Sequence, residues 1–297
     1  MALLDHFYKY ADIEAAEATL VNQCFRYSSP LKFNDPFDIQ NELGTDFDMS
    51  EFPSATMAVI EHYVKNDLPI PNPNVGFGKA ILTMREGARS QGYKKEKIEE
   101  MTYPLLGHLM DEIINGIEGL NKQWNISMRE SRVFCVTEDN DNLLMWAHYS
   151  YDHTGLVFQL ATLAEEDDIL SAARKVEYRD NPVSFFSLQE LIEWVLFGVE
   201  PDFTKVQYSL HAHQKSKHWA YENEWRVVDM QQYDHKYDLH IDHKFKPKQL
   251  ENIYFGCKSD PKDISRLSKI AKEINPAVGI FQSYKKPFEY ALGFKEI

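Results

Sequence analysis

The sequence predicts an α+β fold, with a mixed or mainly antiparallel sheet core, flanking helices and a helical insertion. Short segments rich in aromatic and β-branched residues recur along the chain without regular strand–helix alternation, which disfavours a doubly wound fold. Residues 52–125 show helical periodicity and no strand signal. The 297 residues are 43% hydrophobic and can bury a sizeable core. We therefore expect a single domain over residues 1–297, with a mainly helical insertion at about 52–125.

The N-terminal segment predicts strand, helix, strand and then a polar turn. Phe7–Tyr10 has the aromatic composition of a strand, and Asp12 can cap a helix in which Ile13, Ala16 and Leu20 share one face. Cys24–Tyr27 predicts the return strand.

The sequence of the insertion predicts three helices, at Ser54–Val64, Lys79–Gln91 and Lys95–Ile117, with a Pro/Asn-rich break at 69–74. The charge run at 94–100 is typical of an exposed helix face. Packing is the default role of this insertion, with a lid or a partner-binding surface as alternatives.

After the insertion, strand and helix signals mix. The predicted strands are Arg132–Thr137, Thr154–Leu160, Glu224–Met230, Ile253–Phe255 and Gly279–Ser283. The predicted helices are Leu143–Tyr149, capped by Asn140 or Asp141, and residues 162–174, 187–197, 206–217 and 260–274.

Charge and composition exclude several classes of protein. The net charge is −14, and residues 201–297 hold 16 Lys/Arg against 13 Asp/Glu. Lys244–Lys248 is the one dense basic run, and such a run is typical of a solvated loop, so nucleic acid is disfavoured as a partner. No signal peptide or run of about 20 apolar residues is present, which disfavours a membrane. Three widely spaced cysteines favour reduced thiols and a cytoplasmic location.

Common cofactor and metal motifs are missing. Gly76-Phe77-Gly78-Lys79 lacks the spacing and the Lys-Ser/Thr pair of a phosphate-binding loop. His211 and His213 would point to different faces of a helix, so no metal is expected there. There is no Gly-x-Ser-x-Gly motif.

The hexapeptide Phe33–Asp38 is the most distinctive turn in the chain. Asn34 and Asp35 can accept hydrogen bonds from nearby backbone amides, Pro36 fixes its own φ, and the two Phe residues would anchor the turn in a core. This many polar groups in one turn also suits ligand binding, and a purely structural turn is the alternative.

Glu222-Asn223-Glu224 is the best catalytic candidate. On an extended segment Glu222 and Glu224 would point the same way, on one face with Arg226. Paired carboxylates raise each other's pKa, and a guanidinium favours the ionised form. The alternative is that the three residues form a structural ion-pair ladder.

Several motifs together resemble a bacterial family catalogued only as domain of unknown function 2971. These motifs are Tyr8-Lys9-Tyr10, Phe33–Asp38, Phe134–Glu138, Leu144–Tyr149 and Trp219–Arg226. The resemblance runs from about Leu4 to Phe255, and the family name implies no chemistry.

The order of elements is also similar to that of ADP-ribosyltransferases. This resemblance implies that Lys9, between Tyr8 and Tyr10, takes the first-strand basic position, where that superfamily has His or Arg. Ser28 or Thr137 would take the second position, and Glu224 the late glutamate.

The resemblance implies an NAD-using enzyme, of the kind found in bacterial toxins and phage-defence effectors. A carboxylate would stabilise the oxocarbenium-like transition state of NAD cleavage. Asn34 and Asp35 would bind ribose hydroxyls, and Trp146 and Tyr149, three residues apart on a helix, would wall the pocket. A protein acceptor or a regulatory partner would complete the system. The alternative is a non-catalytic module that binds a nucleotide or a protein.

Overall fold

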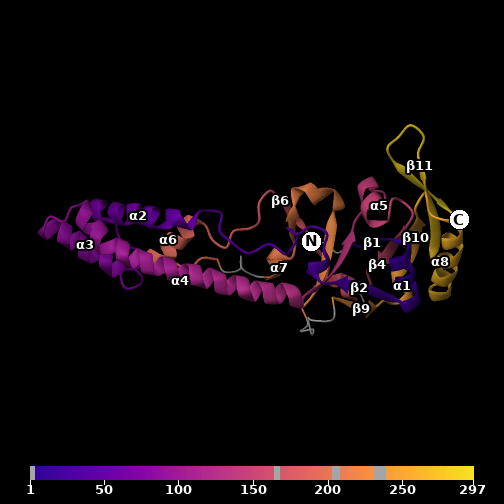
Figure 1. The fold of residues 1–297 in the computed structure, drawn as a ribbon, viewed down its shortest axis with the longest axis horizontal. Coiled ribbons are helices and arrows are strands. Elements are labelled where there is room, and N and C mark those ends of the chain that lie inside the picture. Colours follow the sequence, from indigo (N-terminus) through magenta and orange to yellow (C-terminus); the bar gives the residue numbers. More distant parts are fainter. Residues whose placement is uncertain (1–3, 164–167, 203–207, 231–238) are drawn as a thin grey trace. The chain divides into compact units, whose positions relative to one another are not determined.

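The computed structural model describes residues 4–163, 168–202, 208–230 and 239–297 (Figure 1). The chain divides into two compact units. Unit 1 consists of Met1–Gln40, Ser127–Asn181 and Ala212–Ile297, and unit 2 of Asn41–Ile126 and Pro182–His211.

Unit 1 is built on a ten-stranded sheet whose main path runs β12-β11-β10-β4-β1-β3-β2-β9, with β8 joined to β3 and β5 joined to β8. Of these pairings only β10–β11 is parallel, which confirms the mixed, mainly antiparallel sheet. The strands are β1 (His6–Ala11), β2 (Cys24–Ser28), β3 (Arg132–Thr137), β4 (Leu156–Ala161), β5 (Arg174–Lys175), β8 (Glu224–Asp229), β9 (His240–Lys244), β10 (Leu250–Phe255), β11 (Gly279–Lys285) and β12 (Leu292–Glu296). A separate parallel pair joins β6 (Glu177–Arg179) to β7 (Gln214–Ser216).

The sheet forks at β3, which pairs with β8 along its whole length. On its other edge β3 meets β1 at one register position, Tyr8 opposite Thr137, and β2 at one, Ser28 opposite Val133, among the described residues. Lys9 Nζ donates to the Cys135 carbonyl at 2.8 Å, so a side chain occupies a place where a strand partner would bond. We call this divergence of β1 and β2 beside β3 the fork.

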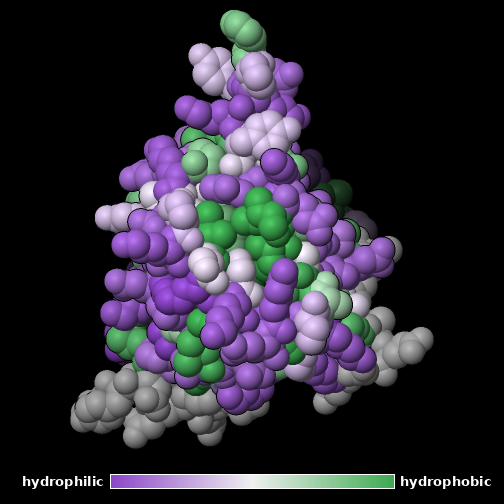
Figure 2. Space-filling view, turned by 90° about the vertical axis from the view of Figure 1, so that its right-hand side faces the viewer, coloured by the Kyte–Doolittle hydropathy of each residue, from purple (hydrophilic) through white to green (hydrophobic). Residues whose placement is uncertain are grey.

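Helices α1 (Ile13–Asn22), α5 (Leu143–Tyr149) and α8 (Pro261–Ile274) complete unit 1. Asp12 caps α1 as predicted, whereas Asn142, not Asn140 or Asp141, caps α5. The core lies between the sheet and α1 and α8, where Phe7, Leu20, Phe158, Phe255 and Leu267 are buried. Burying each such side chain contributes about 1.5–3 kcal/mol. Figure 2 shows a face that is mostly hydrophilic, with an apolar area near its centre and smaller apolar areas around it.

Unit 2 is helical in its described residues. Its helices are α2 (Phe52–Asn66), α3 (Gly78–Ser90), α4 (Lys95–Glu130, whose last residues belong to unit 1), α6 (Leu188–Phe197) and the short α7 (Tyr208–His211). The Asn121 side chain both accepts from the Leu43 amide and donates to the Leu43 carbonyl, at 2.8 and 2.9 Å. The segment Pro182–His211 belongs to the same unit as these insertion helices, an association that was not predicted from the sequence.

Two predicted helices are wrong over their described residues. In the first, Ile169–Ala172 forms a 3-10 helix and Arg174–Lys175 a strand, while residues 164–167 lie outside the described residues. In the second, α7 ends at His211 and Gln214–Ser216 is strand β7, while residues 206 and 207 lie outside the described residues. Lys215 lies buried among carboxylates, and this tertiary contact overrides helix propensity.

Edge strand β9 was also not predicted from the sequence. Its side chains alternate between half-buried and exposed, with exposed His240, Asp242 and Lys244. Charged side chains are typical of edge strands, and they hide the strand signal in the sequence.

Candidate functional site

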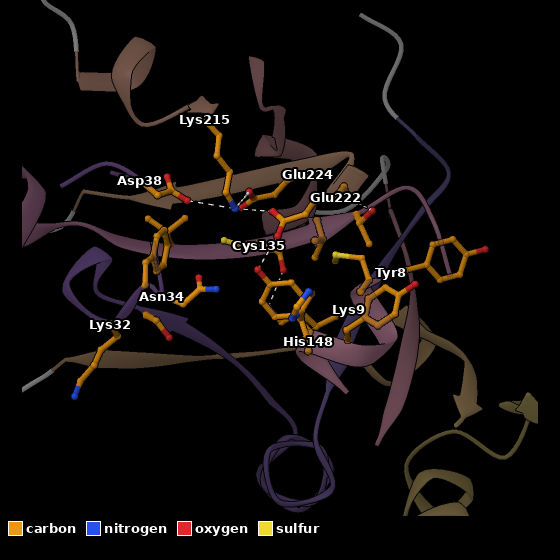
Figure 3. A pocket seen from close by; sticks show the side chains of 18 of the residues that line it. Tyr8, Lys9, Lys32, Asn34, Asp38, Cys135, His148, Lys215, Glu222 and Glu224 are labelled. Atoms are coloured by element: carbon orange, nitrogen blue, oxygen red, sulfur yellow. Dashed lines mark hydrogen bonds and ion pairs between the residues drawn. The ribbon is translucent and has the colours of Figure 1, made fainter. Parts of the chain in front are cut away.

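A pocket of about 360 Å³ lies at the fork, within the size range of small-molecule sites. Its walls come from β1, β2, β3, α5, the turn at 32–38, and the segments before and at the start of β8 (Figure 3). The lining residues are Tyr8, Lys9, Tyr10, Arg26, Ser28, Lys32, Phe33, Asn34, Asp38, Val133, Cys135, Val136, Thr137, Met145, His148, Tyr149, Lys215, Glu222 and Glu224. All of them belong to unit 1.

A buried lysine gathers three carboxylates on one wall. Lys215 Nζ lies 2.5 Å from Glu222 Oε2, 3.1 Å from Glu224 Oε2 and 3.4 Å from Asp38 Oδ2. Figure 3 shows the Lys215 amine between these acids. Its side chain is only 5% exposed, so these contacts are shielded from water and stronger than on a surface.

Arg226 pairs with two of these three carboxylates, those of Glu224 and Asp38. Its guanidinium donates to both oxygens of Glu224, at 2.8 and 3.0 Å, and to Asp38 Oδ2 at 2.6 Å. It also donates to the Ala212 carbonyl. Glu224 and Arg226 are two residues apart on β8 and share a face, as predicted.

Glu222 reaches the same lysine by a different route from the one predicted. It ends the 3-10 helix Lys217–Glu222, so it is not on an extended segment with Glu224. Asn223 between them has φ 42°, in the left-handed region, and its side chain donates to Asp139 at 2.7 Å. This sharp turn brings the two carboxylates together.

The environment pushes the pKa values of the two glutamates apart. Burial raises the pKa of Glu222, and Glu224 adds to this effect against the opposing charge of Lys215. Burial alone would also raise the pKa of Glu224, but Arg226 and Lys215 outweigh it and lower that pKa. Burial disfavours charge on Lys215, yet its three acidic neighbours raise the pKa above the ordinary value. Carboxylates with diverging pKa values are typical of acid–base sites.

Tyr149 is the second partner of Glu222 and lines the pocket. Its hydroxyl donates to Glu222 Oε1 at 2.6 Å. Trp146 lies elsewhere: it is fully buried, packs edge-on against Tyr10 at 5.5 Å and donates to the Asn140 carbonyl. It does not line this pocket, so of the predicted pair only Tyr149 does so.

The residues of the turn Phe33–Asp38 differ in position and contacts. Asn34 is exposed and lines the pocket, whereas Asp35 is buried outside it and accepts the Phe37 amide at 2.9 Å. Asp38, which the site prediction omitted, reaches Lys215 and Arg226. The expected anchoring is half wrong, because Phe37 is 70% exposed, whereas Phe33 lies against the Arg226 guanidinium.

The remaining predicted residues gather around β1. Tyr8, Lys9, Tyr10 and Ser28 all line the pocket. Burial, followed by Tyr254 and Glu251, raises the pKa of Tyr8 to about 12. Arg226 lies behind the wall and acts through Glu224 and Asp38.

A second pocket of about 270 Å³ adjoins the first between α1, β1 and β2. It shares Lys9, Tyr10, Arg26, Ser28 and Tyr149 with the first pocket. The two pockets therefore share part of their lining, and the acid cluster lies in the first pocket.

Among the described residues, no group of three or more His, Cys, Asp or Glu side chains is placed to hold a metal ion. No described helix has both the length and the apolarity needed to cross a membrane.

Residues 145–227 match the model of the family described as "protein of unknown function (DUF2971)". The predicted resemblance is thus confirmed over this segment, which holds Trp146, Tyr149, Glu222, Glu224 and Arg226. Comparison with curated proteins and with solved structures found no match.

Proposed function

We propose that the chain binds NAD in the pocket at the fork, called the fork pocket below, and transfers the ADP-ribose group of NAD to an acceptor. The observation that carries the proposal is a carboxylate, Glu222, held by Tyr149 and Lys215 on the wall of a pocket that shares lining residues with a second pocket. Two adjoining pockets suit the two halves of a dinucleotide, and a fixed carboxylate beside the nicotinamide ribose suits its chemistry.

The reaction balances without a metal or a redox partner. The bond between ribose C1′ and the nicotinamide ring nitrogen breaks, and its electron pair leaves with neutral nicotinamide. Positive charge develops on the ribose, where a carboxylate stabilises it. A nucleophilic atom of the acceptor then bonds C1′ and loses its proton to a base.

Between the two candidate catalytic residues, the geometry favours Glu222 over Glu224, to which the resemblance to ADP-ribosyltransferases assigns the late glutamate position. Both oxygens of Glu224 accept hydrogen bonds from Arg226, and Glu224 therefore serves to position the cluster. The pKa of Glu222 is raised, which suits a base that accepts the acceptor's proton. Tyr8, Lys9, Tyr10, Ser28 and Asn34 would contact the dinucleotide.

The test is incubation of the chain with NAD labelled in its adenylate half, with and without bacterial lysate. Nicotinamide release and transfer of label to protein are both measured. We expect Glu222→Gln to lower turnover by a factor of about 100 or more while NAD affinity changes little. Glu296→Gln, at an exposed position on β12, is the matched control and should retain full turnover. Undiminished turnover in Glu222→Gln would defeat the assignment.

One observation favours a second function, a non-catalytic module that binds a nucleotide or a protein. The three carboxylates Asp38, Glu222 and Glu224 already have cationic partners in Lys215 and Arg226. Saturable NAD binding with no nicotinamide release, from both the chain alone and the chain with lysate, would favour this function.

An enzyme of this kind with a protein acceptor would suit a bacterial toxin or a phage-defence effector. Induced expression in bacteria tests this role, because the active chain should arrest growth and the Glu222→Gln variant should not. Equal growth of both cultures, with NAD turnover intact in the purified chain, would argue against the toxin role alone.

A further inference from the structure

Unit 2 holds an apolar groove that is separate from the fork pocket. It has a volume of about 640 Å³ and is lined by α4, by α6 and by the chain just before α3. Its lining residues are Gly76, Phe77, Leu109, Glu112, Ile113, Gly116, Ile117, Leu120, Phe186, Trp194 and Val195. Leu120 is 41% exposed, so apolar surface here is open to solvent.

The α4 wall of the groove carries the spacing of a helix-packing seam. Leu109, Ile113, Gly116 and Leu120 follow one another at intervals of four, three and four residues. This spacing places them in one stripe, about 16 Å long at the rise of an α-helix. A stripe of this kind matches the side chains of a second helix laid along it.

Gly116 lies in the middle of this stripe. A Cβ built on it would meet no atom within 4 Å, so open space lies above the helix at this position. A glycine in a helix interior costs about 1 kcal/mol relative to alanine. Its place in the seam lets a neighbouring backbone approach closely.

The negative charge around the groove favours a positively charged partner. Glu112 is the charged residue in the lining, and no Lys or Arg is among the described lining residues. The segments that form unit 2 hold 9 Lys/Arg against 17 Asp/Glu, so the unit carries a negative field. A basic flank on the incoming helix would complement it.

We propose that this groove binds an amphipathic α-helix of a partner protein, with a leucine-rich apolar stripe and a basic flank. The partner's apolar side chains fill the groove over Gly116, and its lysines or arginines face Glu112. The proposal rests on unit 2 alone and is independent of the proposed NAD chemistry.

The test uses the full chain and a fluorescent synthetic peptide. The peptide carries Leu at 4-3-4 spacing and Lys on both flanks, and a twin carries Glu in place of Lys. We expect saturable binding of the Lys peptide, about 10-fold tighter than that of the Glu peptide, with the difference shrinking as salt is added. Glu112→Lys should narrow or reverse the preference.

Gly116→Leu should abolish peptide binding by filling the groove. Gly107→Leu is the matched control, because a Cβ at Gly107 also meets open space and that residue does not line the groove. Circular dichroism checks that both variants keep their helix content.

Three results would overturn the proposal. One is equal binding of the Lys and Glu peptides, and another is binding that survives Gly116→Leu. The third is an alternative occupant, either oleate or a second copy of the chain detected by light scattering. In that outcome the occupant binds the unchanged chain but not the Gly116→Leu variant, and the peptide binds neither.

Discussion

Arg226 is fully buried and depends on Glu224 and Asp38 for its charge balance. We predict that Glu224→Gln lowers the free energy of unfolding by about 3–5 kcal/mol, because it leaves a buried guanidinium short of a counter-charge. Glu222→Gln should have a smaller effect, since Glu222 does not contact Arg226. Urea denaturation of both variants measures the difference, and equal stabilities would contradict it.

The two glutamates should also give stability opposite dependences on pH. The folded pKa of Glu224 is lowered, so its contribution is present above the unfolded value of about 4.3 and is lost as pH falls. The folded pKa of Glu222 is raised, so its contribution is present below that value and is lost as pH rises through the folded pKa.

Relative to the unchanged chain, Glu222→Gln should therefore gain stability as pH rises from about 4 to neutrality, whereas Glu224→Gln should lose stability as pH rises towards about 4.3 and change little above it. Free energies of unfolding at pH values below and above about 4.3 check the prediction. Parallel pH profiles for the two variants would show that the pKa shifts have been assigned to the wrong residues.

Sequence reasoning placed much of the candidate site by residue type. Lys9, Tyr149, Glu222 and Glu224 all line one pocket, as their motifs predicted. Lys215 was missed, because it was predicted to lie on a helix, and its contact with the distant Asp38 is not visible in a single sequence. Asp38 drew attention as part of a turn, but its bond to Arg226 joins residues 188 positions apart, which a single sequence does not show.

At the scale of elements, the turn before β8 decides how the acid cluster forms. Asn223 adopts a left-handed conformation that a residue with a plain Cβ resists. We predict that Asn223→Ala lowers the free energy of unfolding by about 1–2 kcal/mol, and that Asn223→Gly lowers it less, because glycine accepts this φ. Thermal unfolding of the two variants measures the difference. If alanine were tolerated better than glycine, the left-handed conformation of residue 223 would not be what limits the choice of residue there.

Strands and helices with strong local signals were predicted well. Strand β3 has the predicted bounds, and Asp12 caps α1 as expected, because capping and β-propensity act over a few residues. Strand β7 was predicted as helix, because its partner β6 and Asp38, which contacts Lys215, come from elsewhere in the chain. Local propensity is weak compared with such contacts.

At the scale of the molecule, each unit has its own buried core. Ile60 on α2 and Ile253 on β10 are both fully buried, one in each unit. We predict that Ile60→Ala lowers the stability of unit 2, and Ile253→Ala that of unit 1, each by about 2–5 kcal/mol.

Hydrogen exchange followed segment by segment separates the two effects. Faster exchange should be confined to the helices of unit 2 in the first variant and to the sheet in the second. Uniform loosening of the whole chain by either substitution would show that the two cores unfold as one.

The fork has a consequence for how a bound molecule would register in the backbone. One edge of β3 pairs with β8 at every residue, while the other edge pairs with β1 and with β2 at one position each. Exchange with deuterated water should therefore be slow at amides on the β8 side and faster at those that face the fork. A ligand lying between β1 and β2 would shield the fast set and leave the slow set unaltered. The exchange pattern of the sheet then reports whether the pocket is occupied, without a label on the ligand and before any chemistry takes place.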